Sequence, residues 1–430
     1  MKLPAHTSDV WISRICCLVV KSPELRKTSL LVGQWTFPRL KLYIENPMTL
    51  PRFRLFILGA GFSQPAGLPL GRELLDDVRC RVREVFQKNG WDGPLEDEIK
   101  EWQQLYPENQ LNLESVFAYS HRKHFLRVIG SDEYFEHGSR SIVEARHAIQ
   151  AILTARLPSS TPSLYREFAS QLTPFDTVLT FNYDTLLEQA LEEIDKPFSL
   201  TPEWWLDDST AGVESQNSPR FVDLIKLHGS IDWYDRKYYD QSREYFRTHN
   251  SDVPDRDPLF GPDRFVPIET LAKGSVAEAF KGDLLARVFR VPNHRRFFPF
   301  ADSWNVVPFL LPPAFEKLLG HDPICDLWQN MHRTLDAYSV IAIIGYSMPP
   351  YDGYAYEAIG RLLINYQAGG DRPYFDQRRV PLQVITRASS DEEVCRAIPF
   401  LRPEVTKIWT EGFSHASLQW LDWGDTTETA

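Results

Sequence analysis

Residues 54–69 read Arg-Leu-Phe-Ile-Leu-Gly-Ala-Gly-Phe-Ser-Gln-Pro-Ala-Gly-Leu-Pro, an apolar run that ends in closely spaced glycines. The apolar residues from Leu55 to Leu58 are typical of a parallel strand that is buried on both faces. Gly59 and Gly61 then allow the backbone to turn tightly and to come close to a ligand. In such a loop, exposed N–H groups and the positive end of a following helix can face a pyrophosphate. We therefore interpret this stretch as a nucleotide-binding element around which the chain is organised.

The loop alone is a weak signal. Its third glycine stands at position 67, which is too far along the chain for the G-x-G-x-x-G pattern of dinucleotide-binding loops. Glycine pairs after strands are also common as plain turns, so the loop by itself leaves a phosphate site and a simple turn equally open. An amphipathic helix is expected next, with these residues on its apolar face: Leu74, Leu75, Val78, Val82, Val85 and Phe86.

The composition predicts a folded protein with no strong bias toward nucleic acid. At 430 residues and 43% apolar content, the chain can bury a real core and hold one α/β domain with insertions, or two or three domain-sized units. Its 47 basic and 58 acidic residues give a net charge of -11, which argues against a dedicated surface for duplex nucleic acid. We expect no direct nucleic-acid partner.

The cysteine pattern and the hydropathy argue for a cytoplasmic protein. The chain has five cysteines, an odd number, with no C-x-x-C pair, so neither a disulfide framework nor a zinc ribbon is indicated. No metal site is expected. No apolar run reaches the roughly 18 residues needed to cross a bilayer, so we also expect no membrane partner.

Strand and helix patterns alternate after residue 53. Apolar strands are expected at 55–58, 176–181, 221–227, 306–311, 340–344 and 381–385, the last of these closing the sheet. A helical insertion is expected at about 90–172, and further helices at 185–194, 324–335 and 354–364. This alternation predicts an α/β fold, a Rossmann-like parallel sheet with helices on both faces, plus the helical insertion and a second, loop-rich insertion.

The domain boundaries follow from the same pattern. Residues 1–47 show no sustained period, so we expect an N-terminal extension outside the fold, and Met48 is an alternative start of the native chain. Residues 48–395 form the predicted domain, and 396–430 are a C-terminal segment that closes it. The second insertion, at about 236–303, mixes aromatic, basic and acidic residues. Such a mixture can bind single strands, but the acids favour a folded surface excursion.

Polar clusters follow five of the expected strands. Because ligands of parallel sheets bind outside the carboxyl ends of the strands, we expect these clusters to converge there: Gly59 to Ser63, Asn182 to Asp184, His228, Gly345 to Ser347, and Thr386. Each has a simpler reading on its own, since Asn182 or Asp184 can cap the next helix and His228 can be an ordinary loop histidine.

Taken in order, four of these motifs resemble the Sir2 superfamily, specifically its bacterial Sir2-like branch. The motifs are Gly59-Ala-Gly-Phe-Ser63 with Ala66-Gly-Leu-Pro69, Thr180-Phe-Asn-Tyr-Asp184, Leu227-His-Gly229 and Gly345-Tyr-Ser347. The resemblance covers roughly residues 52–390 without the insertions. It implies NAD as the ligand and substrate.

The resemblance also implies roles for individual residues. Asn182 and His228 would be catalytic, with His228 as the base, and Asp184 would help to line the nicotinamide pocket. The remaining cofactor-binding positions would be Gly59, Ala60, Gly61, Phe62 and Ser63 for the phosphates and ribose, and Gly345, Ser347 and Thr386 toward the adenosine half.

Two departures from the family pattern bear on the reaction. Protein deacylases of the superfamily carry an Asp-Phe-Arg signature after the glycine loop and a four-cysteine zinc module; here Pro69-Leu-Gly-Arg72 follows the loop and no such cysteines are present. The resemblance therefore favours the branch that hydrolyses NAD+ to nicotinamide and ADP-ribose in bacterial antiviral defence, without zinc. A deacylase or ADP-ribosyltransferase and a non-catalytic NAD or ADP-ribose sensor remain alternatives. A regulatory protein partner or a homo-oligomer is also open.

Overall fold

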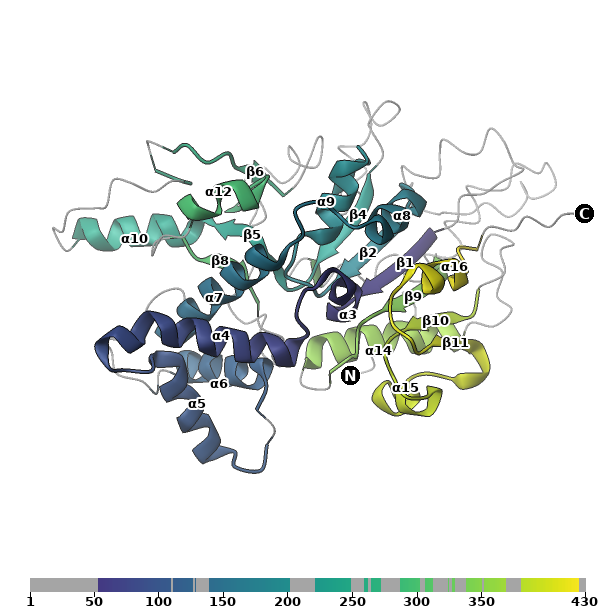
Figure 1. Ribbon diagram of the computed structural model, residues 1–430, viewed down its shortest axis with the longest axis horizontal. Helices are drawn as coiled ribbons and strands as arrows, with labels where there is room; N and C mark the ends of the chain where they lie inside the picture. The colour runs from purple at the N-terminus through teal and green to yellow at the C-terminus, as the bar shows by residue number, and fades with distance from the viewer. Residues whose placement is uncertain are drawn as a thin grey trace, which may run out of the picture.

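The structure, a computed structural model, centres on the strand Phe53–Leu58 and the glycine loop that follows it (Figure 1). It describes residues 53–109, 111–126, 128, 139–201, 221–248, 259–261, 264–271, 287–301, 306–311, 324, 327–328, 338–349, 352–368 and 380–424. The expected extension at 1–47 lies outside these residues, as does most of the helix expected at 324–335. No helix in the described ranges combines the length and apolar character needed to span a membrane.

Seven parallel strands form the main sheet, in the order β11-β10-β9-β1-β2-β4-β3. Their bounds are β1 Phe53–Leu58, β2 Asp176–Thr180, β3 Phe198–Ser199, β4 Val222–Lys226, β9 Tyr338–Ile344, β10 Leu382–Ile385 and β11 Thr406–Trp409. Helices flank the sheet, so the predicted α/β, Rossmann-like architecture is confirmed. Successive side chains along β1, from Leu55 to Leu58, point to opposite faces of the sheet, and all of them are almost fully buried. The centre of the sheet is therefore covered on both faces.

The chain order across the sheet reverses beside β1. Strands β2, β4 and β3 extend the sheet on one side of β1, and β9, β10 and β11 extend it on the other. The loops after β1 and β9 therefore leave neighbouring strands and lead to opposite halves of the sheet. Such a switch point is where open parallel sheets bind ligands, outside the carboxyl ends of their strands.

Four α-helices lie in the described residues of the predicted helical insertion. They are α5 Pro94–Leu105, α6 Leu113–Leu126, α7 Arg140–Arg156 and α8 Ser163–Gln171. The first three pack with α4, Gly71–Phe86, the helix predicted after the glycine loop. The apolar face of α4 is buried as expected except at Val85, which is 53% exposed. The prediction that Val85 lies on the buried face was therefore wrong.

A small antiparallel sheet in the order β6-β7-β5-β8 lies outside the main sheet. Its strands are β5 Gly229–Asp235, β6 Glu269–Thr270, β7 Val288–Arg290 and β8 Pro308–Leu310, and it is accompanied by α10 Arg236–Thr248 and α12 His294–Ala301 (Figure 1). Within the described part of the second insertion lie α10, β6, β7 and α12. The strand expected at 306–311 was counted with the parallel strands; that was wrong, because β8 pairs antiparallel with β5.

The C-terminal segment adds a strand that was not predicted from the sequence. After α14 Gly353–Ala368 and β10, the chain forms α15 Asp391–Ala397, then β11, then α16 His415–Trp420. Strand β11 pairs in parallel with β10, so the strand at 381–385 is not the last of the sheet. Only Ile408 and Trp409 give β11 an apolar character, and all four of its residues are partly or fully exposed, which is typical of an edge strand.

A buried ion pair joins β1 and β2 at the sheet edge opposite the glycine loop. Arg54 donates from Nε and Nη2 to the two carboxylate oxygens of Asp176, at 2.7 and 2.6 Å. The Arg54 guanidinium also lies 4.9 Å from the ring of Trp423 and donates to the Gln171 carbonyl. The bidentate contact fixes the register of the two strands at their amino ends.

His294 links the helical insertion to the small sheet. Its Nε2 lies within hydrogen-bonding distance of Gln150 Nε2 at 3.1 Å and of the Tyr234 hydroxyl at 3.2 Å. Its Nδ1 lies 3.5 Å from Thr154 Oγ1. Burial lowers the pKa of His294 from its ordinary value of 6.5 to about 4, because the imidazolium would lose hydration.

We predict that His294 makes the fold sensitive to mild acid. The unfolded chain takes up this proton below pH 6.5 while the folded chain does not until about pH 4, so stability falls as the pH drops through that window. Between pH 7 and pH 5 the loss from this residue alone is about 2 kcal/mol. Urea unfolding of the wild type and of His294→Gln measures it, since the stability difference between them should shrink by that amount. A pH-independent difference would contradict the assignment.

Candidate functional site

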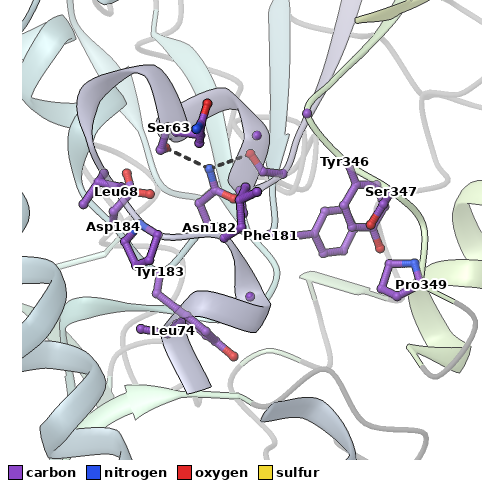
Figure 2. Close-up of a pocket in the computed structure, with 18 of the residues that line it drawn as sticks. Ser63, Leu68, Leu74, Phe181, Asn182, Tyr183, Asp184, Tyr346, Ser347 and Pro349 are labelled. Carbon is purple, nitrogen blue, oxygen red and sulfur yellow. Dashed lines mark hydrogen bonds between the residues drawn. The ribbon is translucent and has the colours of Figure 1, made fainter. Parts of the chain in front are cut away.

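A cavity of about 470 Å³ lies at the carboxyl ends of the parallel strands, over the switch point beside β1 (Figure 2). The structure brings together ten of the eleven site residues predicted from the sequence in its lining: Gly59, Ala60, Gly61, Ser63, Asn182, Asp184, His228, Gly345, Ser347 and Thr386. These residues come from the ends of five strands. Their convergence follows from the parallel sheet, in which all carboxyl ends meet at one edge.

Phe62 is the exception. Its side chain is 1% exposed and points into the core, where its ring stacks on Phe413 at a centroid distance of 4.7 Å and meets Tyr165 and Phe168 edge to face. The Phe62 side chain is therefore in the core and not in the lining of the cavity. The residue lies in the one-turn helix α3, Ala60–Ser63, and anchors the glycine loop by apolar packing.

The glycine loop packs against the loop after β9, backbone to backbone. A Cβ on Gly61 would lie 2.7 Å from the Cα of Gly345, and one on Gly59 would lie 2.6 Å from the Cα of Tyr346. The N–H groups of Gly59 and Gly61 donate to the carbonyls of Ile344 and Gly345, at 3.0 and 2.9 Å. Both positions therefore need glycine because another loop occupies the space.

These contacts correct the expected mechanism of the loop. The N–H groups of Gly59 and Gly61 serve the neighbouring loop, so they are not the donors that were expected to face a phosphate. The left-handed backbone is found at Gly345, with φ of 64°, and not at Gly61. The predicted helix after the loop begins only at Gly71, so its N-terminus does not follow the glycines directly.

Asn182 is held against the glycine loop by its side-chain amide. Its Nδ2 donates to the carbonyl of Gly59 at 3.0 Å and to the hydroxyl of Ser63 at 3.1 Å (Figure 2). Its backbone N–H donates to Thr180 Oγ1 at 3.1 Å. Asn182 is 9% exposed and lines the cavity. With both amide protons used, the side-chain oxygen Oδ1 is the atom that can accept a hydrogen bond from a ligand or water.

The loop from Asn182 to Asp184 is braced from below. Lys226, at the end of β4, is fully buried and donates from Nζ to the carbonyl of Asp184 at 2.5 Å and to Glu188 Oε1 at 2.6 Å. The Tyr183 carbonyl accepts the Ile231 N–H at 3.0 Å. Asp184 itself accepts the N–H of Leu186, the first residue of α9 (Leu186–Glu193), at 3.0 Å, and it also lines the cavity.

His228 follows β4 and pairs with an aspartate from the other half of the sheet. Its Nε2 lies 2.9 Å from Asp352 Oδ2, and both side chains are buried. The imidazole meets the ring of Phe181 edge to face at a centroid distance of 5.0 Å. Phe181 in turn stacks on Tyr346 at 4.1 Å, so aromatic rings form one wall of the cavity. This environment holds the imidazole in a defined orientation.

Three charged lining residues were missed from the sequence: Glu114, Asp352 and Arg387. Glu114 comes from the start of α6, in the helical insertion, where no pattern linked it to the strand ends. Burial raises the pKa of the Glu114 carboxyl, and the negative charge of Asp352 raises it as well. For the other two, the available signal was that they lie close in sequence to predicted site residues. Arg387 directly follows Thr386, and Asp352 lies five residues after Ser347.

A comparison with known families points to the same loops. Residues 176–259 match the family model of the SIR2-like domain, a stretch that contains β2, the loop with Asn182 and Asp184, and His228. This match supports a relationship to the Sir2 superfamily and an NAD-related function. The glycine loop lies outside the matched stretch and is joined to it by the bonds of Asn182 to Gly59 and Ser63.

Sirtuins are among the solved structures that align with the chain. One described as "The Structural basis of Sirtuin Substrate Affinity" is 14% identical, with 86% of this chain and 92% of that chain covered and a TM-score of 0.32. Sir2Tm bound to a propionylated peptide is 12% identical, with 84% and 88% covered and a TM-score of 0.29. Both TM-scores lie below 0.5, so these similarities do not define the fold. The strand order of this chain defines it. No curated protein sequence matches the chain.

We predict that Gly345→Ala destabilises the protein more than Gly67→Ala by about 2 kcal/mol or more. Both glycines have positive φ, so both variants carry the same kind of backbone strain. A Cβ at 345 would lie 2.2 Å from the Phe62 nitrogen, whereas one at 67 meets nothing within 4 Å. The excess therefore measures the clash between the two loops. Equal losses in urea unfolding would mean that the loops are not in contact.

Proposed function

We propose that this protein hydrolyses NAD+ to nicotinamide and ADP-ribose in the cavity at the carboxyl ends of the strands. The observation that carries the proposal is the placement of the Asn182 amide and the His228–Asp352 pair in one cavity beside the glycine loop. The match of residues 176–259 to the SIR2-like domain supports NAD as the ligand. A volume of about 470 Å³ lies within the roughly 300–1,000 Å³ typical of small-molecule sites.

Hydrolysis of NAD+ does not need a general acid from the protein. Hydrolysis breaks the bond between the ribose C1′ and the nicotinamide nitrogen, and the bonding electrons neutralise the cationic ring. The leaving group is neutral, so no general acid is required. Water forms the new bond to C1′ and loses a proton. The protein must hold the ribose, stabilise an oxocarbenium-like transition state and accept that proton.

His228 and Asn182 fit the last two of these requirements. An imidazole can accept a proton from water, and His228 is the histidine among the described residues that line the cavity. Asn182 has no proton to exchange, but its Oδ1 can orient water or a ribose hydroxyl while its Nδ2 stays bonded to Gly59 and Ser63. The amide dipole is thus already oriented before the ligand binds, which is the condition for electrostatic stabilisation.

The charges around the cavity suggest how the dinucleotide would lie. Asp184 and the His228–Asp352 pair supply negative charge on the side of β2 and β4. Arg387, after β10, is the one lysine or arginine among the described lining residues. The cationic nicotinamide riboside half would therefore face the carboxylates and the diphosphate would face Arg387. Ser347 and Thr386 would then lie near the adenosine half.

The proposed biological role is antiphage defence by depletion of NAD. It is supported by the likeness to the bacterial Sir2-like branch and by the sequence departures from deacylases: the missing Asp-Phe-Arg signature and the lack of paired cysteines. An enzyme that empties the cell of NAD has to be inactive until triggered, so a regulatory protein or self-assembly would control it. Deacylation, ADP-ribosyl transfer and ligand sensing without turnover are the competing functions.

Replacing either working residue should abolish turnover and spare binding. We expect Asn182→Ala and His228→Ala each to lower the rate of nicotinamide release by at least roughly a hundredfold, because they remove the oriented dipole and the base. NAD+ should still bind, since the glycine loop and Arg387 are intact. Rates are measured by chromatography of nicotinamide and ADP-ribose, and binding by calorimetry, on the triggered protein.

His415→Ala provides the matched control, because His415 is exposed and pairs with Glu167 away from the cavity. It should keep the wild-type rate. A wild-type rate in His228→Ala would overturn the assigned base. Formation of O-acetyl-ADP-ribose from an acetylated peptide would favour deacylation instead, and tight binding without any product would favour a sensor.

A further inference from the structure

Asp352 contacts His228 across the switch point of the sheet. His228 follows β4, Asp352 precedes α14, and the two residues are 124 positions apart in the chain. Their side chains are 5% and 0% exposed, so water does not compete for the 2.9 Å contact. A carboxylate can only accept at neutral pH, so the proton in this bond belongs to Nε2 of the imidazole. The pairing therefore selects one tautomer of His228.

The carboxylate is itself fixed by the start of α14. Its Oδ1 accepts the N–H of Ala355 at 3.3 Å, while Oδ2 faces His228. The Asp352 backbone N–H donates to the carbonyl of Pro349 at 3.0 Å, and its carbonyl accepts the N–H of Tyr356 at 2.8 Å. One carboxylate oxygen thus caps a helix while the other holds the imidazole. Helix α14 therefore fixes the position and the orientation of the Asp352 carboxylate relative to His228.

We propose that Asp352 is a positioning residue for the reaction, acting through His228. This inference rests on the proposed NAD+ hydrolysis. Asp352 keeps the proton on Nε2, so Nδ1 carries the electron pair that takes the proton from the attacking water. As the water O–H bond breaks and the N–H bond forms, the imidazole becomes a cation, and the adjacent carboxylate stabilises that charge.

The surroundings of the pair are consistent with this positioning role. The Glu114 carboxyl from α6 lies close enough to Asp352 for the Asp352 charge to raise its pKa, and the Tyr183 ring from the loop after β2 lies 6.0 Å from the imidazole. Phe181 covers another side of the ring. Because the Asp352 carboxylate is in hydrogen-bond contact with the imidazole, it favours the protonated imidazole in the transition state.

Asp352→Asn separates positioning from capping. Asparagine caps helices about as well as aspartate, so α14 should stay in place. Its amide would donate to Nε2, which moves the imidazole proton to Nδ1 and removes the electron pair from the working nitrogen. We expect kcat to fall about a hundredfold or more, with the Kd for NAD+ within about twofold and the melting temperature within about 2 °C of the wild type.

Ser390→Ala is the matched control for a lost helix cap. Ser390 caps α15 with its hydroxyl, which accepts the Glu393 N–H, and it lies outside the cavity lining. This variant should lose stability and keep kcat. If Asp352→Asn keeps the wild-type kcat between pH 6 and pH 8.5, Asp352 is a cap only and the inference is wrong.

A second readout holds even if the protein turns out not to hydrolyse NAD+. Proteins labelled with ¹⁵N-histidine report the tautomer by NMR, with the His228 signals assigned by their loss in His228→Ala. The wild type should carry its proton on Nε2 and Asp352→Asn on Nδ1. No hydrolysis together with this tautomer change refutes the proposed function, and it shows that Asp352 sets the tautomer of His228 whatever the reaction is. The same tautomer in both proteins refutes the positioning role.

Discussion

The close contact between two glycine loops is the constraint on which the rest of the site depends. Gly61, after β1, and Gly345, after β9, are so near that neither has room for a side chain. Their strands are neighbours at the point where the chain order of the sheet reverses. Because the loops support each other through N–H to carbonyl bonds, the cavity wall at the switch point is built from backbone. Asn182 then bonds to this wall, and His228 reaches Asp352 beyond it.

Buried charges complete the support for the site. Lys226 lies below the Asn182 loop with Glu188 as its partner, and Arg290 pairs with Asp232 at 2.8 Å in the adjoining small sheet. Buried ion pairs contribute little net stability, since desolvation offsets their attraction, but a lone buried charge is strongly unfavourable. These pairs therefore permit few alternative arrangements of the loops that they touch. Rigid support of this kind is what a preoriented amide such as that of Asn182 requires.

The sequence predicts the parallel sheet well because apolar runs such as Leu55 to Leu58, each followed by polar residues, carry the pattern locally. It does not separate β8 from the parallel strands, since an apolar run does not encode the direction of its partner. The convergence of Asn182 and His228 follows from topology. The part played by Asp352 does not, because its contact joins residues 124 positions apart. Glycine at position 61 was expected to let the backbone approach a ligand, but it is needed because the loop after β9 occupies the space. The sequence of one loop does not show which other loop packs against it.

The central claim is that NAD+ lies in this cavity with its nicotinamide ribose beside Asn182 and His228. A crystal structure of the His228→Ala variant with intact NAD+ tests it most directly, because the variant should bind the dinucleotide without consuming it. The ribose C1′ is predicted to lie within about 4 Å of Asn182 Oδ1, with the diphosphate toward Arg387. A dinucleotide bound in the reverse direction or outside the cavity, or an empty cavity at saturating NAD+, would contradict the claim.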